Sequence, residues 1–91
     1  MKHEAHEIRL KRLMMRSMRR GIKEMDLILS DYASRNLAAM SEAEIAHYES
    51  LLDENDQDLY QWVSGQIPAP DRFSDLIADI ARGALGLVRP A

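Results

Sequence analysis

The sequence contains no cysteine, only four glycines and three prolines, and aromatic residues make up 5% of it. Without cysteine the chain can form neither disulfides nor thiolate metal sites, and it offers no thiol nucleophile. The glycines, at positions 21, 65, 83 and 86, are too scattered for a phosphate-binding loop. The low aromatic content leaves no platform on which nucleic-acid bases could stack. These absences exclude several kinds of enzyme and binding site.

Long apolar runs are absent as well. No stretch is long enough to span a bilayer, and Met1 to Arg12 alternates charges where a secretory signal would be apolar. Glu4 and Glu7 also count against a mitochondrial transit peptide, which is poor in acidic residues. A small domain without cysteine suits a reducing compartment. We therefore expect a protein of the bacterial cytoplasm that does not insert into a membrane.

The charges are unevenly distributed along the 91 residues, although the net charge is only −3. Basic residues crowd the first segment: Arg9, Lys11, Arg12, Arg16, Arg19, Arg20 and Lys23. Acidic residues crowd the middle: Glu42, Glu44, Glu49, Asp53, Glu54, Asp56 and Asp58. This asymmetry has three explanations, namely a nucleic-acid footprint, an acidic protein partner, or two faces that attract each other within the fold.

Apolar residues recur at helical spacing throughout, and no stretch alternates as a strand would. The fold class is therefore an all-α, single-domain bundle of about five short helices, in which residues 1–6 and 87–91 form mobile tails. The predicted helices are His6 or Glu7 to Arg19, Ile22 to about Asn36, Ser41 to Asp53, Asn55 or Asp56 to Gly65, and Asp71 to a weak end at Gly83 or Gly86.

Several local signals set these boundaries. Ser41 and Glu44 form an S-x-x-E capping box, and Gly65 is expected to end the fourth helix. Trp62 is expected to anchor the core. The methionines at positions 14, 15, 18 and 25 are expected to be mostly in the core, although methionines of this kind can also line a pliable partner groove.

Gly21 separates the first two helices, across a connection of only a residue or two. A glycine here has two explanations. It can adopt a positive φ and end the first helix, or its missing side chain can leave backbone open to a close partner.

The sequence contains only weak signals for catalytic or metal-binding residues. His3 and His6 are three residues apart, whereas the zincin pattern requires a spacing of four, so a functionally silent terminus is expected around Glu4 and Glu7. Asp56 and Asp58 are expected to cap a helix and complement its dipole instead of acting as acid and base. We expect neither a metal site nor an enzyme.

Two motifs nevertheless carry a resemblance. The first is Arg20-Gly21-x-x-Glu24 within Arg-Arg-Gly-Ile-Lys-Glu-Met-Asp, and the second is D-x-D-L-[FY]-x-W, which runs from Asp56 to Trp62. Together with the basic lead-in, the length and the all-α pattern, they make the region from Arg9 to Trp62 resemble the family of succinate dehydrogenase flavinylation factors, also called assembly factor 2.

The resemblance implies a five-helix assembly chaperone. Such a factor binds the flavoprotein subunit of succinate dehydrogenase, or in bacteria fumarate reductase, and promotes covalent attachment of FAD to a histidine of that subunit. FAD then belongs to the client, and the factor binds no cofactor stably, acts as a monomer and needs no nucleic acid. The residues that the resemblance assigns to partner binding are Arg20, Gly21 and Glu24, with Arg19 and Asp26 beside them, and Asp58 and Tyr60 from the second motif.

Two other functions remain open from the residues. The basic first helix could bind phosphates in a small helical nucleic-acid-binding regulator. Alternatively, the chain could be a structural bundle that associates only with copies of itself.

Overall fold

The helices begin and end close to where the capping residues, glycines and prolines place them. The computed structural model describes residues 5–84. Its elements are α1 (His6–Met18), α2 (Lys23–Asn36), the 3-10 turn η1 (Leu37–Ala39), α3 (Glu42–Leu52), α4 (Asp56–Val63) and α5 (Asp71–Ala84). Residues 5–84 contain no strand, so the all-α prediction of about five helices is confirmed. The predicted tail 87–91 lies outside the described residues, as do residues 1–4, whereas His6 already belongs to α1.

Three of the local signals act as predicted. The Ser41 hydroxyl accepts the Glu44 backbone N–H at 3.2 Å, and the Glu44 carboxylate accepts the Ser41 N–H at 2.8 Å, which completes the capping box. The Asn55 side chain accepts the Gln57 N–H at 2.7 Å and caps α4. Gly65 ends α4 with φ +83°.

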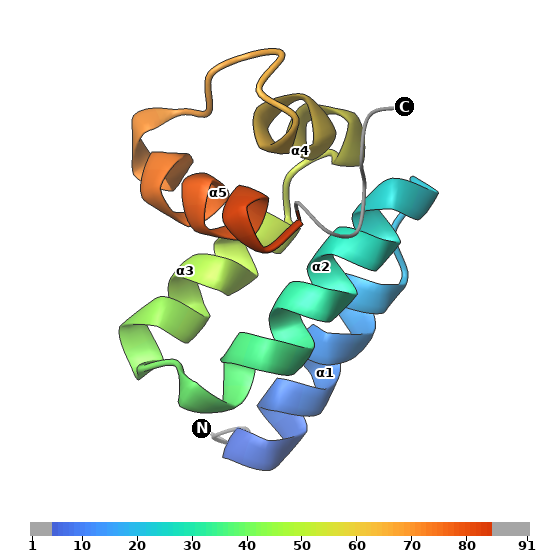
Figure 1. The fold of residues 1–91 in the computed structure, drawn as a ribbon. Helices are drawn as coiled ribbons and strands as arrows, with labels where there is room; N and C mark the ends of the chain where they lie inside the picture. Colours follow the sequence, from blue (N-terminus) through green and yellow to red (C-terminus); the bar gives the residue numbers. More distant parts are fainter. Residues whose placement is uncertain (1–4, 85–91) are drawn as a thin grey trace.

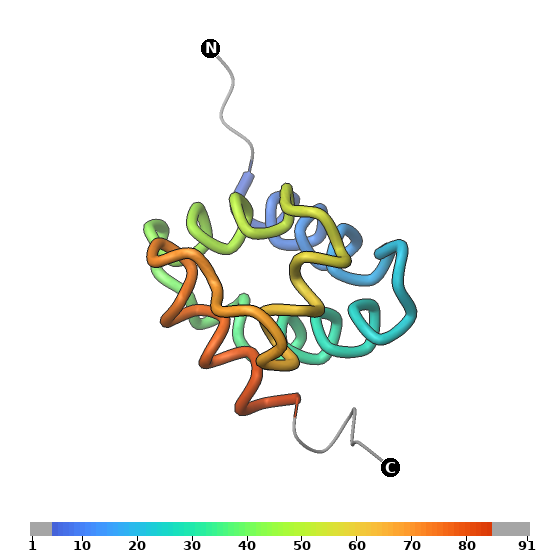
Figure 2. Tube along the Cα trace, turned by 90° about the horizontal axis from the view of Figure 1, so that it is seen from above, coloured from blue at the N-terminus to red at the C-terminus, as the bar shows by residue number. Residues whose placement is uncertain are grey.

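The helices are arranged around a central core. α1 and α2 run antiparallel and side by side, α3 and α5 lie across from them, and α4 lies near the joint of the first two helices (Figure 1). Viewed from above, the helices surround a common centre (Figure 2). Every helix contributes: the largest fully buried side chains are those of Tyr48, Phe73, Leu13, Met25, Leu29, Ile45, Leu51, Leu59 and Ile80, with Ser17 beside them.

Ser17 and Tyr48 form a polar contact inside this core. The Ser17 hydroxyl lies 2.7 Å from the Tyr48 hydroxyl and also donates to the Leu13 carbonyl at 2.8 Å. Because serine has one hydroxyl proton, Tyr48 is the donor to Ser17. Burial raises the pKa of Tyr48 to about 12, which keeps the phenol protonated and able to donate. This pair fixes α1 against α3.

Two expectations about the core were wrong. Trp62 is only partly buried, whereas Phe73 is fully buried, with its ring centre 6.2 Å from that of Trp62. Among the four methionines, Met25 is fully buried and Met14 is partly buried against the core, but Met15 and Met18 are exposed by 47% and 53%. None of the helices within residues 5–84 has the length and apolar character needed to cross a membrane.

Candidate functional site

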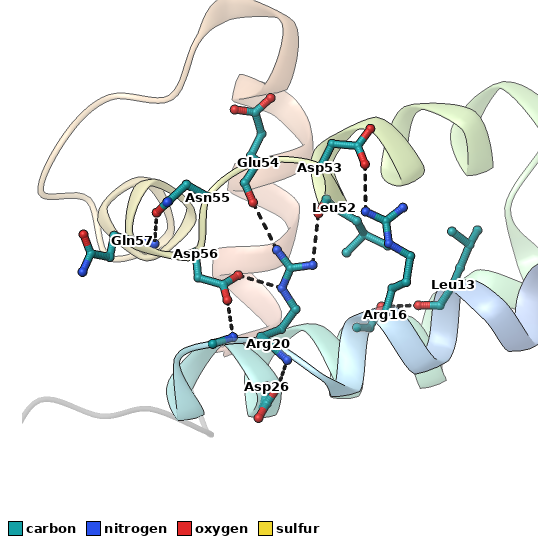
Figure 3. Close-up of polar contacts among 12 residues, drawn as sticks. Leu13, Arg16, Arg20, Asp26, Leu52, Asp53, Glu54, Asn55, Asp56 and Gln57 are labelled. Atoms are coloured by element: carbon teal, nitrogen blue, oxygen red, sulfur yellow. Dashed lines mark hydrogen bonds and ion pairs between the residues drawn. The ribbon is translucent and has the colours of Figure 1, made fainter.

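The joint between α1 and α2 comprises Arg19–Ile22, which makes it longer than the one or two residues expected. The N-cap position of α2, Ile22, offers no side-chain cap. Instead, the Asp26 carboxylate reaches back and accepts the backbone N–H of Arg20 (Figure 3). Asp26 therefore holds the joint in shape from within the same chain.

The Arg20 side chain turns inward at the joint. Its Nε donates to the Asp56 carboxylate at 2.7 Å, and its two terminal nitrogens donate to the carbonyls of Leu52 and Glu54, each at 3.1 Å (Figure 3). Only 9% of the side chain is exposed. The resemblance assigns Arg20 to partner binding, whereas in the structure its side chain lies in a largely buried internal bridge.

This bridge joins three parts of the fold. Leu52 is the last residue of α3, and the carbonyls at a helix C-terminus lack partners within the helix and carry partial negative charge. Asp56 is the first residue of α4, where a carboxylate complements the positive end of the helix dipole. The planar guanidinium donates to all three oxygens at once from three separate nitrogens. A lysine has a single nitrogen and cannot make the same three hydrogen bonds with good geometry. Arg20 thus fixes the joint to the turn between α3 and α4.

Gly21 is explained by a close approach and not by backbone conformation. Among residues 5–84 the positive φ occurs at Gly65 alone, which excludes a positive φ as one of the two explanations offered for Gly21. The Gly21 N–H donates to the second oxygen of Asp56, and a Cβ added at Gly21 would lie 3.2 Å from that oxygen. The missing side chain makes room for Asp56 of the same chain, while the residue remains exposed on its other side.

Charged and apolar groups are exposed around the joint. Arg19 and Glu24 are exposed, and neither makes an ion pair or a side-chain hydrogen bond with another residue in the described part of the chain. Leu27 is 47% exposed and lies three residues after Glu24, on the same face of α2. We call Arg19, Gly21, Glu24 and Leu27 the joint patch.

The remaining predicted partner-binding residues lie on α4. Asp58 is exposed in its first turn, and Tyr60 is partly buried against the core. No hydrogen bond or ion pair within residues 5–84 connects either residue to the joint.

Sequence reasoning assigned neither Asp56 nor Leu27 to this site. Asp56 was expected to cap a helix, and it lies 36 residues from Arg20, beyond the reach of any local pattern. Leu27 follows the α2 pattern by position, and its residue type gives no sign that it is exposed.

Ion pairs between α1 and α3 account for much of the uneven charge. Arg9 lies 2.8 Å from Glu42 and 3.2 Å from Glu49, and Arg12 lies 2.8 Å from Glu49. The hydrogen bond from Arg12 is the main cause that lowers the pKa of Glu49. Arg16 pairs with Asp53 at 2.8 Å. Of the three explanations for the charge asymmetry, attraction between two faces of the fold is therefore directly observed.

Metal ligands do not gather in the described structure. No group of three or more histidine, cysteine, aspartate or glutamate side chains within residues 5–84 is placed to hold a metal ion. His3 and Glu4 lie outside the described residues, so the structure does not bear on the expectation for that terminus.

Curated relatives carry the name succinate dehydrogenase assembly factor 2, mitochondrial. One from Meyerozyma guilliermondii is 40% identical over 75 residues, which cover 79% of this chain and 56% of the relative. One from Scheffersomyces stipitis is 43% identical over 75 residues, and the match covers 50% of that relative. One from Saccharomyces cerevisiae is 42% identical over 67 residues, and the match covers 41% of that relative. The chain thus spans about half the length of the curated relatives it matches.

These names correct one expectation. The matched relatives are named as mitochondrial proteins and come from yeasts, so the prediction of a bacterial cytoplasmic protein was wrong. The prediction rested on Glu4 and Glu7 and on general composition, neither of which identifies a source organism or a compartment.

A family model described as flavinator of succinate dehydrogenase matches residues 11–84. The match covers most of the chain and includes the joint, the Arg20 bridge and all of α2 to α5. The chain therefore belongs to the family of flavinators of succinate dehydrogenase.

Proposed function

We propose that this chain binds the flavoprotein subunit of succinate dehydrogenase and promotes the covalent attachment of FAD to it. The observation that carries the proposal is the family match over residues 11–84, which includes the joint patch. The names of the relatives, as assembly factors of succinate dehydrogenase, support the same client. A second client in this proposal is the flavoprotein subunit of fumarate reductase, to which FAD would be attached in the same way.

The joint patch is the surface that we assign to client binding. Glu24 and Arg19 offer charges of both signs that are not committed to partners within residues 5–84, so a client can pair with them without breaking contacts of this fold. Gly21 leaves backbone accessible between them, and Leu27 adds an apolar contact next to Glu24. Arg20 and Asp26 act indirectly, because their bonds hold the joint in the conformation that presents this patch. We place Asp58 and Tyr60 at its periphery, on α4.

The chain's contribution to FAD attachment is conformational in this proposal. FAD is bound by the client, and the histidine that becomes linked to it is also the client's. The joint patch binds the client conformation in which these groups are correctly placed, and preferential binding raises the population of that conformation. The chain acts as a monomer, and no catalytic step is assigned to its own side chains.

The alternative of a nucleic-acid-binding regulator finds less support. Three arginines of the basic first helix, Arg9, Arg12 and Arg16, already pair with carboxylates of α3 and of the residue that follows it. Phosphates would have to compete with these internal partners.

Neutralising Glu24 is expected to weaken client binding without changing stability. We expect Glu24→Gln to raise the Kd for the isolated flavoprotein subunit at least tenfold, which is about 1.4 kcal/mol of binding free energy. The melting temperature stays within a degree or two, because an exposed charge contributes little to folding. Calorimetric titration and a thermal melt of the same preparations measure both quantities.

Asp75→Asn is the matched control, since Asp75 is an exposed carboxylate on α5, away from the joint. Its Kd should equal that of the wild-type chain. If the wild-type chain does not bind the subunit, the proposed function is rejected. If Glu24→Gln binds as tightly as Asp75→Asn, the joint patch is not the docking surface.

A further inference from the structure

The outer face of α1 is built unlike that of an ordinary solvent-exposed helix. An open groove of about 550 Å³ runs along it. The groove is lined by Ile8, Lys11, Arg12, Met15, Arg16, Arg19 and Arg20. Five of these seven side chains are cationic, and none is acidic. We call this surface the α1 groove.

Apolar side chains follow the middle of this face. Ile8 and Met15 are seven residues apart, which places them about 10 Å apart on one side of the helix. They are 59% and 47% exposed, and Met18, which is 53% exposed, lies one turn beyond Met15. The opposite side of α1 carries Leu13 and Ser17, which are fully buried. The core is therefore formed by the opposite side of α1, and the exposed apolar residues Ile8, Met15 and Met18 are not part of it.

The cations that flank this apolar row are not all used by the fold. Arg12 is paired with Glu49 of α3, and Arg16 is paired with Asp53, the residue that follows α3. Lys11 and Arg19 make no ion pair with any other residue in the described range. A ligand in the α1 groove would thus meet uncommitted positive charge beside an uncovered apolar row.

We infer that the α1 groove binds an acidic, amphipathic segment of the client flavoprotein, as a second contact that adjoins the joint patch and shares Arg19 with it. Carboxylates of this segment pair with Lys11 and Arg19, and its apolar side chains pack on Ile8 and Met15. Methionine suits this purpose because its flexible, polarisable side chain adapts to the shape of a partner. The identification of the client rests on the proposed function.

The chemistry of the groove favours a protein segment over a nucleic acid. A nucleic-acid backbone would leave Ile8, Met15 and Met18 uncovered, and no aromatic residue lines the groove to stack a base.

A photo-cross-linking experiment tests this inference. The cross-linking amino acid p-benzoylphenylalanine replaces Met15 in one variant and Ile67 in another, and each is illuminated with the isolated flavoprotein subunit. Ile67 is the matched control because it is 45% exposed and lies in the α4–α5 connection, outside the groove. We expect position 15 to cross-link to a client peptide rich in aspartate and glutamate, and position 67 to give no such product.

Affinity measurements complete the test. We expect Met15→Glu to raise the Kd for the subunit at least tenfold and Ile67→Glu to leave it within twofold. Lys11→Glu, at a groove position outside the joint patch, should also weaken binding and reduce its salt dependence. The charge-matched control is Arg82→Glu, since Arg82 is exposed on α5 in an ion pair that contributes little. Thermal melts confirm that each variant is folded.

The outcomes separate the two proposals. If the wild-type chain does not bind the subunit, the proposed function fails, and this inference fails with it. If the wild-type chain binds, and Met15→Glu binds as tightly as Ile67→Glu, the inference alone is overturned. It is also overturned if position 15 cross-links to a basic or neutral client peptide. If position 15 cross-links to phosphatidylserine vesicles or to RNA, and not to the subunit, the groove binds those ligands instead and the inference is overturned.

Discussion

Replacing Arg20 with alanine is expected to lower the free energy of unfolding by about 3 kcal/mol, as breaking a largely buried ion pair does. The substitution leaves Asp56 without its cationic partner and the carbonyls of Leu52 and Glu54 without their donor. In a domain of this size, such a loss corresponds to a decrease in melting temperature on the order of 10–20 °C. Urea unfolding and thermal melts measure it. Arg20→Lys should recover only part of the loss, because an ammonium cannot reach all three oxygens with good geometry.

The neighbouring Arg19 is the control for this prediction. It is exposed and unpaired within residues 5–84, so Arg19→Ala should change the free energy of unfolding by less than about 0.5 kcal/mol. Equal stability of the two variants would show that the bridge does not hold the joint in solution. If the bridge does hold the joint, Arg20→Ala disturbs the fold, and a loss of client binding in this variant is then explained by that disturbance. Variants of Glu24 are then the better test of recognition.

Phe73→Ala is expected to be at least as destabilising, at about 4 kcal/mol, because removing a fully buried aromatic ring leaves a cavity. The Phe73 ring lies between those of Trp62 and His47, with centre distances of 6.2 Å and 5.3 Å. Trp62→Ala should cost only about 2 kcal/mol, because part of the indole already contacts water. Thermal or urea unfolding of both variants gives the order. A greater loss for Trp62→Ala would mean that Trp62 anchors the core, as its size first suggested.

The helices could be predicted from the sequence because their boundaries depend on neighbouring residues. The capping box at Ser41 and Glu44 and the stop at Gly65 are local features, and the structure contains both. Apolar spacing also identified the buried face of α2, where Met25 and Leu29 are fully buried.

The inner and outer faces of α1 were harder to predict, because its pattern is not a simple apolar stripe. Ser17 is polar and yet fully buried, since it bonds to Tyr48 of α3. Met15 is apolar and yet exposed. A contact between residues 31 positions apart decides which side of α1 turns inward, and helical spacing carries no information about such a contact.

Not all of the residues that the sequence assigns to the candidate site are exposed, as a contact surface requires. The exposed positions of Arg19, Gly21 and Glu24 are compatible with the predicted contact surface. Arg20 faces inward because Asp56 and two carbonyls satisfy its guanidinium. This bridge depends on the position of α3 and α4 against the joint. No motif within the first two helices predicts that position.

Covalent FAD in the flavoprotein subunit is the most direct test of the account. In-gel flavin fluorescence of denatured subunit is compared in native host cells that lack this chain and in the same cells supplied with the wild-type chain, Glu24→Gln or Asp75→Asn at equal levels. We predict a strong signal with the wild-type chain and with Asp75→Asn, and a weak signal with Glu24→Gln and without the chain. An equal signal with and without the chain would contradict its role in FAD attachment.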